Sequence, residues 1–470
     1  MDQEGAIARP LTTARRLLPE HLGSAAFLRD HGVRYAYVAG SMFKGTASQG
    51  MVVRMARAGL LAYFGTGGLR TERVEEVIRA LDATLGAGRA YGMNLLCSPG
   101  APRKEERLVD LLLAHRVPRV EAAAFIRMTP ALVRYRVTGL TPTPSGGVDV
   151  PHKVLGKVSR PETAEAFLSP PPPAVVRDLL LAGSISAQEA ELAARVPMAD
   201  DLCVEADSGG HTDQRPLVTL LPAMLRVRES VAADRLPGAA DVRVGVAGGI
   251  GTPEAVAAAF MMNADFVLTG SINQCTVEAG TSDAAKDMLQ QAEVQDTAIV
   301  PAGDMLEIGA KAQVLRKGLL FPTRANKLYE LTLRHNSLEE LDGRTARQIQ
   351  DKYFHRTFDE VWQETAGYLR TTDPDQLAAA ERDPKLRMIL VFKWYFVHSA
   401  RLAMSGAPEQ RVDYQIPCGP ALGALNGLLR GTAREHWRAR HVDDLAELLM
   451  AGAARLWQQR LDEVAARQQA

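Results

Sequence analysis

The stretch VRVGVAGGIGTPEAVAAAFMMNADFVLTGS, residues 242–271, decides the fold class. It starts with the alternating apolar residues of a buried strand at 242–247, turns at a glycine cluster, and continues with helical periodicity before a second strand at 265–269. Thr252 can cap the helix, and Pro253 suits its first turn. This order of elements is typical of parallel strands joined by a crossover helix.

The same unit recurs along the first half of the chain. Each copy begins with a short run of β-favouring residues, passes through glycine or polar residues, and ends in a helical stretch such as 71–81. We predict strands at 35–40, 60–64, 91–96, 119–124, 154–159, 202–207, 242–247 and 265–269. Eight such units predict a TIM (β/α)8 barrel, which is an α/β fold.

Three segments depart from this repeat. Residues 133–153 contain two apolar runs around the turn-forming TPTPSGG, which predicts a hairpin inserted before the fifth strand. The proline run at 169–173 predicts a stiff spacer between two outer helices, with docking of a partner as the alternative. Strand signals disappear from about residue 282. We therefore predict a barrel domain over 1–281 and a mainly helical region over 282–470 packed on it.

Composition excludes several classes of protein. A chain with 46% hydrophobic and 23% charged residues can bury a large core, and its 55 basic side chains balance 55 acidic ones. No overall charge therefore attracts nucleic acid or an anionic membrane. The longest apolar stretch, 255–262, is far shorter than the roughly 18 residues of a membrane span. The N-terminus lacks the apolar core of a signal peptide. We expect a soluble protein.

The four cysteines point to a reducing compartment. They stand at positions 97, 203, 275 and 418. This spacing is too wide for a paired zinc or redox motif, and four thiols are too few for a disulfide framework in a chain of this length. We expect a cytoplasmic protein, and nothing in the sequence specifies an oligomeric state.

Glycine-rich loops follow the last two predicted strands. AGG at 247–249 and TGS at 269–271 lie at the strand ends that carry function in TIM barrels. Backbone N–H groups in such loops can approach phosphate oxygens closely, so the adjacent pair predicts a phosphate site. The alternative is that these glycines only turn strand into helix. The spacing does not match the GxGxxG of a dinucleotide-binding fold, and the chain has no P-loop.

Polar residues lie within or just after three other predicted strands. Asn94 ends the third, Lys157 lies in the fifth, and the sixth runs into EADSGGHTD at 205–213. An amide, a cation and a carboxylate at a barrel mouth can bind the edge of a heterocycle, and Lys157 can stabilise negative charge on a flavin. His211 lies on a loop that can bring its imidazole over a cofactor, so we predict an active-site role, with a structural histidine as the alternative. The loop lacks a second histidine or cysteine at ligand spacing, so we predict no metal site.

Long blocks of the sequence resemble the PfaD family. These are the flavin-dependent enoyl reductases of polyunsaturated fatty acid synthases and of polyketide synthases whose acyltransferases act in trans. The matching blocks are EADSGGHTD (205–213), GVAGGIGTPEA (245–255), LTGSINQCTVEAGTS (268–282), AGDMLE (302–307), KAQVLRKGLLFP (311–322), FKWYF (392–396) and DYQIPCGPALGALN (413–426). They extend along nearly the whole chain. The barrel also resembles nitronate monooxygenases and FMN-dependent enoyl reductases of carrier-protein substrates, which usually lack the C-terminal blocks.

The resemblance implies a function and a site. It implies an FMN-binding barrel over 1–281 that takes hydride from NADPH or NADH and passes it to a 2-enoyl thioester on an acyl carrier protein, among synthase modules. His211 would be the catalytic residue near the substrate. The residues implied to bind FMN are Ala39, Gly40, Asn94, Lys157, Glu205, Ser208, Gly209, Gly210, Gly248, Gly249, Gly270 and Ser271.

Two departures and two alternatives accompany the resemblance. Cys97 stands where the family has a histidine before Ser-Pro, and Lys393 stands where arginine is commoner. Both bear on packing or substrate details and leave the flavin contacts intact. One alternative is a nitronate monooxygenase, which uses the same barrel with O2 as oxidant. The other is an inactive docking subunit whose helical region binds carrier proteins, and such a protein would be colourless.

Overall fold

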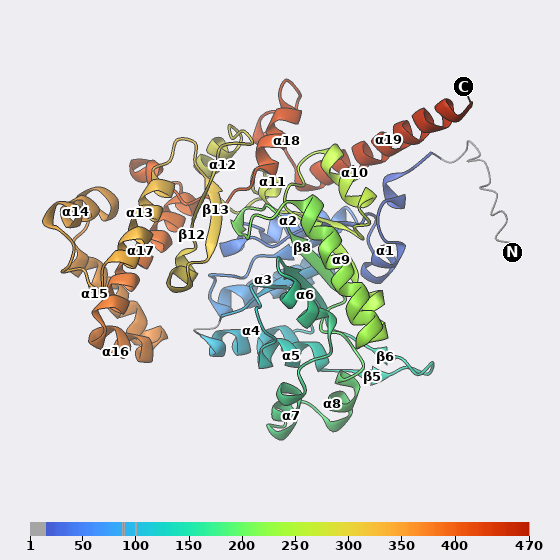
Figure 1. Ribbon diagram of the computed structural model, residues 1–470, viewed down its shortest axis with the longest axis horizontal. Coiled ribbons are helices and arrows are strands. Elements are labelled where there is room, and N and C mark those ends of the chain that lie inside the picture. Colours follow the sequence, from blue (N-terminus) through green and yellow to red (C-terminus); the bar gives the residue numbers. More distant parts are fainter. Residues whose placement is uncertain (1–15, 87, 89, 99–100, 470) are drawn as a thin grey trace, which may run out of the picture.

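Eight parallel strands close into a barrel in the computed structural model, which describes residues 16–469 except 87, 89, 99 and 100 (Figure 1). The strands are β1 (Tyr37–Ala39), β2 (Leu61–Phe64), β3 (Tyr91–Leu96), β4 (Arg119–Ala123), β7 (Lys153–Val158), β8 (Asp201–Glu205), β10 (Arg243–Ala247) and β11 (Val267–Thr269). They occur at the eight predicted positions, and β11 returns to pair with β1. The predicted TIM barrel is confirmed.

Helices follow the strands and cover the outside of the barrel. They are α2 (Gln49–Arg57), α3 (Thr71–Leu85), α4 (Pro102–Ala114), α5 (Pro130–Val137), α6 (Pro161–Leu168), α9 (Leu217–Asp234), α10 (Pro253–Met261) and α11 (Ser271–Gln274), with α1 (Ala25–His31) before the first strand and α7 (Pro173–Leu181) and α8 (Ala187–Ala193) before β8. The Thr252 hydroxyl accepts a hydrogen bond from the backbone N–H of Ala255, as predicted for the cap of α10. The proline run lies between α6 and α7, in the predicted spacer position.

The inserted hairpin is shorter than predicted. Its arms are β5 (Thr141–Pro142) and β6 (Val148–Asp149), whereas residues 133–137, predicted as part of its first arm, belong to α5. Thr129 caps that helix, and Pro130 starts it. Most of its residues are buried, so it lacks the exposed polar face that marks a helix in a sequence.

The C-terminal region holds helices and a small sheet. The helices are α12 (Asp283–Leu289), α13 (Phe321–Arg334), α14 (Gly343–Gln348), α15 (Phe358–Thr372), α16 (Pro374–Arg382), α17 (Pro384–Ser405), α18 (Ala421–Leu429) and α19 (Val442–Gln469). Antiparallel strands β12 (Thr297–Pro301) and β13 (Lys311–Leu315) contradict the expectation that strands end near residue 282. A strand from a barrel loop, β9 (Gly210–His211), completes their sheet. Apolar runs this short do not differ in periodicity from buried helix segments.

The helical region has its own core and also contributes to that of the barrel. Phe321, Phe354 and Tyr395 belong to a cluster within the region on the left of Figure 1. Leu445 and Leu449 of α19 are instead fully buried in the cluster that includes the barrel strands. Each buried leucine of this kind contributes about 1.5–3 kcal/mol. The last helix therefore stabilises the barrel directly.

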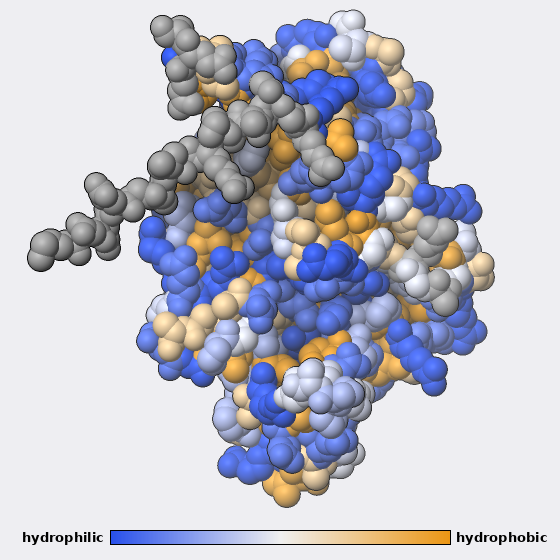
Figure 2. All heavy atoms as spheres, turned by 90° about the vertical axis from the view of Figure 1, so that its right-hand side faces the viewer, coloured by the Kyte–Doolittle hydropathy of each residue, from blue (hydrophilic) through white to orange (hydrophobic). Residues whose placement is uncertain are grey.

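The surface carries hydrophobic residues in separate patches. On the face in Figure 2, these patches lie between hydrophilic residues. Among the helices of the described residues, none combines the length and the apolar character needed to cross a bilayer.

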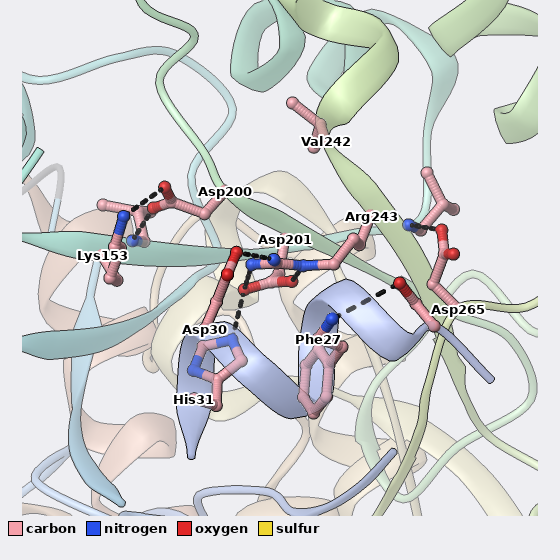
Figure 3. Close-up of polar contacts among 12 residues, drawn as sticks. Phe27, Asp30, His31, Lys153, Asp200, Asp201, Val242, Arg243 and Asp265 are labelled. Carbon is pink, nitrogen blue, oxygen red and sulfur yellow. Dashed lines mark hydrogen bonds and ion pairs between the residues drawn. The ribbon is translucent and has the colours of Figure 1, made fainter. Parts of the chain in front are cut away.

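A buried ion network occupies the end of the barrel where the strands begin (Figure 3). Asp201 starts β8, and its carboxylate accepts hydrogen bonds from Arg243 and from Nε2 of His31, the latter at 2.8 Å. Arg119 donates to Nδ1 of His31, which fixes the tautomer. Burial raises the pKa of Asp201, but His31 and Arg243 outweigh burial and lower the pKa to about 2. The ionised form is thus favoured in the folded protein.

We expect Asp201→Asn to lower the free energy of unfolding at neutral pH by about 3 kcal/mol, because it removes the buried charge partner of Arg243 and leaves only the exposed Asp30 to pair with it. A carboxyl group whose pKa is lower in the folded protein than in the unfolded chain stabilises the fold at pH values above its unfolded pKa. This stabilisation is lost as the pH falls toward the folded pKa. The difference between wild type and variant should therefore shrink below about pH 4. Urea unfolding, followed by circular dichroism at neutral and at acidic pH, measures this difference in the free energy of unfolding.

Asp30→Asn is the matched control. Asp30 also pairs with Arg243, but its side chain is 48% exposed. Its loss should cost about 1 kcal/mol or less. An Asp201→Asn penalty that is equally large at neutral and acidic pH would contradict the role of the charge.

Candidate active site

The predicted site residues gather at one end of the barrel. All eight strands are parallel, so their carboxyl ends meet there. The strand register places Asn94 beside Glu121 and Ala247 beside Glu205. Ala39 is fully buried opposite Thr269, and the N–H of Gly40 donates to the Thr269 carbonyl at 2.9 Å. These two residues therefore pack within the wall of the barrel.

Gly248 and Gly249 form a cradle after β10. Both have positive φ angles, +87° and +74°, which favour glycine. A Cβ atom on Gly248 would lie 2.7 Å from the backbone of Ala206, so this residue touches the neighbouring loop. Cβ atoms on Gly249 and Gly270 would meet no atom of the described part of the chain within 4 Å. The cradle therefore packs against the neighbouring loop at Gly248 and leaves space for a ligand beside Gly249 and Gly270.

A segment of the helical region lies against these loops. The N–H of Gly419 donates to the Ser271 hydroxyl at 2.9 Å. A Cβ atom on Gly209 would lie 2.9 Å from the Gly419 nitrogen, and one on Gly251 would lie 2.1 Å from the Ala421 carbonyl oxygen. Such close backbone approach requires glycine. Sequence reasoning did not identify Gly419 as a contact of the barrel loops, although it lies in the block 413–426, in the Gly-Pro pair just before α18.

The cradle fits a phosphate group such as that of FMN. The Ser208 hydroxyl is buried and has no hydrogen-bond partner among the described residues. Buried hydroxyl groups normally have a partner, and a phosphate oxygen is a suitable acceptor. With the open space at Gly249 and Gly270, this hydroxyl supports an anion at the predicted position.

Lys157 lies between two carboxylates. Its Nζ atom is 2.7 Å from Glu205 and 3.2 Å from Glu121. Burial lowers the pKa of Lys157, but the two carboxylates outweigh burial and raise the pKa above its usual value. Glu121 is fully buried and also accepts hydrogen bonds from the N–H and hydroxyl of Ser41, at 2.8 and 3.0 Å. Lys157 is therefore held as a cation at the barrel mouth.

The structure adds one residue to this cluster and gives the contacts of another. Sequence reasoning missed Glu121, although a charged residue inside an apolar strand is a usable signal. Asn94 is at the predicted strand but uses its amide N–H to donate to the Glu121 carbonyl at 3.0 Å. Its amide oxygen remains to bind a heterocycle.

His211 is paired with a carboxylate that sequence reasoning did not identify. Its Nε2 atom is 3.0 Å from Oδ1 of Asp304, and the two side chains are 43% and 54% exposed. Burial of the imidazole lowers its pKa, but Asp304 and the charge of Glu205 outweigh burial and raise the pKa above the usual value. The only sequence signal for Asp304 was its place in the block 302–307.

Comparison with known proteins finds, among others, a close structural match and several longer relatives. Residues 335–414 match the family model described as [acyl-carrier-protein] S-malonyltransferase, inserted helical domain. The polyketide biosynthesis protein PksE of Bacillus subtilis (strain 168) is 50% identical over 95% of this chain. A polyunsaturated fatty acid synthase component of Thraustochytrium sp. is 42% identical over 87% of it. The chain spans only 58% and 28% of the lengths of these two proteins.

The close match is a solved structure. The enoyl reductase domain of MlnA, from the macrolactin biosynthesis cluster of Bacillus amyloliquefaciens, is 42% identical. The alignment includes 94% of this chain and 99% of that domain, with a TM-score of 0.89. The likeness therefore includes both the barrel and the helical region.

Proposed function

Because this chain belongs to the PfaD family of enoyl reductases, with the enoyl reductase domain of MlnA as a member of near-equal length, we propose that it reduces 2-enoyl thioesters on an acyl carrier protein. Its cofactors in this proposal are FMN and either NADPH or NADH. The observation that carries the proposal is the arrangement of the barrel mouth. The open glycine loops and the Ser208 hydroxyl, which has no partner among the described residues, lie at the same strand ends as Lys157 and His211.

The chain offers two groups of residues to FMN. Backbone N–H groups at the glycine loops and two hydroxyls would hold the phosphate, and the polar cluster would hold the ring edge. The phosphate group comprises Gly209, Gly210, Gly248, Gly249, Gly270, Ser208 and Ser271, and the edge group comprises Asn94, Lys157 and Glu205. When bound, FMN supplies a hydride at N5 that originates from the nicotinamide.

Lys157 and His211 have separate tasks in this proposal. Lys157 stays protonated between Glu121 and Glu205 and stabilises negative charge at the ring edge. The substrate gains a hydride at its β-carbon and a proton at its α-carbon, so two hydrogens are added. His211 donates that proton, since a raised pKa keeps a larger fraction of the imidazole protonated near neutral pH.

The similarity of the helical region to a known domain supports acyl carrier protein as a partner. Residues 335–414 match a domain of an enzyme that itself acts on acyl carrier protein, and the longer relatives are named as synthase components or biosynthesis proteins. We propose synthase modules as the source of the tethered substrate. The four cysteines are buried free thiols, in keeping with the reducing cytoplasm as its compartment.

An assay with a 2-enoyl carrier protein tests the function. With NADPH or NADH under anaerobic conditions, the flavin absorbance should bleach and then recover when the enoyl carrier protein is added. Mass spectrometry should find two added hydrogens on the acyl chain. Flavin that NADPH and NADH do not bleach under anaerobic conditions, and that a nitronate reduces instead, would favour a monooxygenase. A colourless protein would favour an inactive docking subunit.

A further inference from the structure

The carboxylate beside His211 comes from outside the barrel. Asp304 lies in the 3₁₀ turn η4 (Gly303–Ile308), which connects β12 to β13. His211 lies in β9, on the loop after the barrel strand β8. The two residues are 93 positions apart in the sequence and 3.0 Å apart at Nε2 and Oδ1. Two regions of the chain thus build this pair together.

One sheet fixes the backbone of both partners. His211 pairs with Ala312 of β13 in antiparallel register, and the N–H of Thr212 donates to the Lys311 carbonyl at 3.3 Å. The turn that carries Asp304 is closed by a hydrogen bond from the Ala302 N–H to the Ala310 carbonyl at 2.8 Å. The separation of the two side chains is therefore set by strand pairing.

Helix α17 holds the turn from the other side. Lys393 donates to the Asp304 carbonyl at 3.2 Å and to the Glu307 carboxylate at 2.5 Å. A Cβ atom on Gly303 would lie 2.5 Å from Cβ of Phe396, so glycine is required for the turn to pack on the helix. One turn of α17 thus anchors the segment that carries Asp304.

The charges around His211 favour its protonated form. Asp304 contacts the imidazole, and Glu205 of β8 adds a second negative charge, whereas Lys157 of β7 opposes them. The charge of Lys393 of α17 also helps to lower the pKa of Asp304. Burial raises the pKa of Asp304, but the bond to His211 outweighs burial and lowers the pKa, so the carboxylate stays ionised. The pair therefore behaves as an acid held beside a fixed anion.

We propose that Asp304 is a positioning residue that binds Nε2–H of His211 and leaves Nδ1–H as the proton donated to the substrate. The proposal rests on the function given above. In the donation step the N–H bond at Nδ1 breaks and leaves its electron pair on nitrogen. The electron pair of the enolate forms the new C–H bond at the α-carbon, and solvent later restores the proton.

The pH profile separates this role from a structural one. If protonated His211 is the active form, kcat/KM falls as pH rises through its pKa. Loss of the Asp304 charge should move that fall to lower pH. We expect Asp304→Asn to remain within about 3-fold of wild type near pH 6 and to lose about 10-fold or more near pH 8. Asp304→Glu, which restores a carboxylate, should recover much of the loss.

Glu307→Gln is the matched control. Glu307 lies in the same turn and binds Lys393, yet it does not contact His211. This variant should keep the wild-type pH profile and flavin content. An equal loss for both variants at every pH would mean that the turn is only structural, and it would overturn the proposal.

A second readout does not need activity. With ¹³C-labelled histidine, the His211 signal can be assigned by its absence in His211→Ala and titrated in each variant. We expect its midpoint to fall in Asp304→Asn and to stay unchanged in Glu307→Gln. An unchanged midpoint in Asp304→Asn would overturn the proposal. If enoyl reduction is not observed at all, the proposed function fails, while this titration still decides whether Asp304 controls His211.

Discussion

His211→Ala is expected to lower the turnover of enoyl reduction by about 100-fold or more and to leave the flavin in place. The imidazole lies on β9 beside Asp304, whereas the open positions of the proposed phosphate site, Gly249 and Gly270, lie in the loops after β10 and β11. Removing the ring therefore takes away the proton donor without opening the cradle. Single-turnover kinetics with the flavin reduced beforehand measure the loss at the chemical step.

A histidine far from the mouth provides the comparison. His115 follows α4 on the outside of the barrel and contacts Glu75. His115→Ala should keep wild-type turnover and flavin content. If His211→Ala reduces the enoyl thioester as fast as wild type, His211 is a structural residue and another group supplies the proton.

Gly249→Asp is expected to give a colourless protein that folds. The position faces open space, so the side chain fits, but it places a carboxylate where the phosphate is proposed to bind. Repulsion between two anions in a partly buried cradle should remove most of the FMN. Absorbance after gel filtration, with total flavin released by heat, measures the occupancy.

Gly249→Asn separates charge from backbone strain. Both side chains have the same size, and both tolerate the positive φ of +74° better than other residues do. The asparagine variant should therefore retain clearly more FMN than the aspartate variant. Full FMN occupancy in Gly249→Asp would show that the phosphate does not lie at this loop.

The barrel was predictable because its signals are local. Strand β3 occurs at the predicted residues 91–96, since a buried parallel strand between glycine or polar turns has a distinctive pattern. The cap of α10 and the open position of Gly249 also follow from short sequence motifs. The residues that such motifs place at the barrel mouth could therefore be named from the sequence.

The remaining contacts depend on pairing between distant segments. Strand β9 has two residues and exists only because β13 pairs with it. Asp304 and Gly419 reach the mouth through tertiary packing of the helical region, and nothing in their local sequence states which barrel loop they meet. Glu121 was missed for another reason: its charge inside a strand was a usable local signal, but its partners Lys157 and Ser41 come from other strands and loops.

The sheet shared by β9 and β13 also sets an order of events during synthesis on the ribosome. The last barrel strand, β11, ends at Thr269, so the barrel wall can close while residues 311–315 are still to be made. The loop with His211 acquires its strand partner only when β13 emerges, and the wall receives α19 last of all. A nascent chain stopped between these points would have the glycine loops of the proposed phosphate site but no strand partner for the loop that carries His211. The proposed reductase activity should therefore appear late in translation, after the barrel itself has formed.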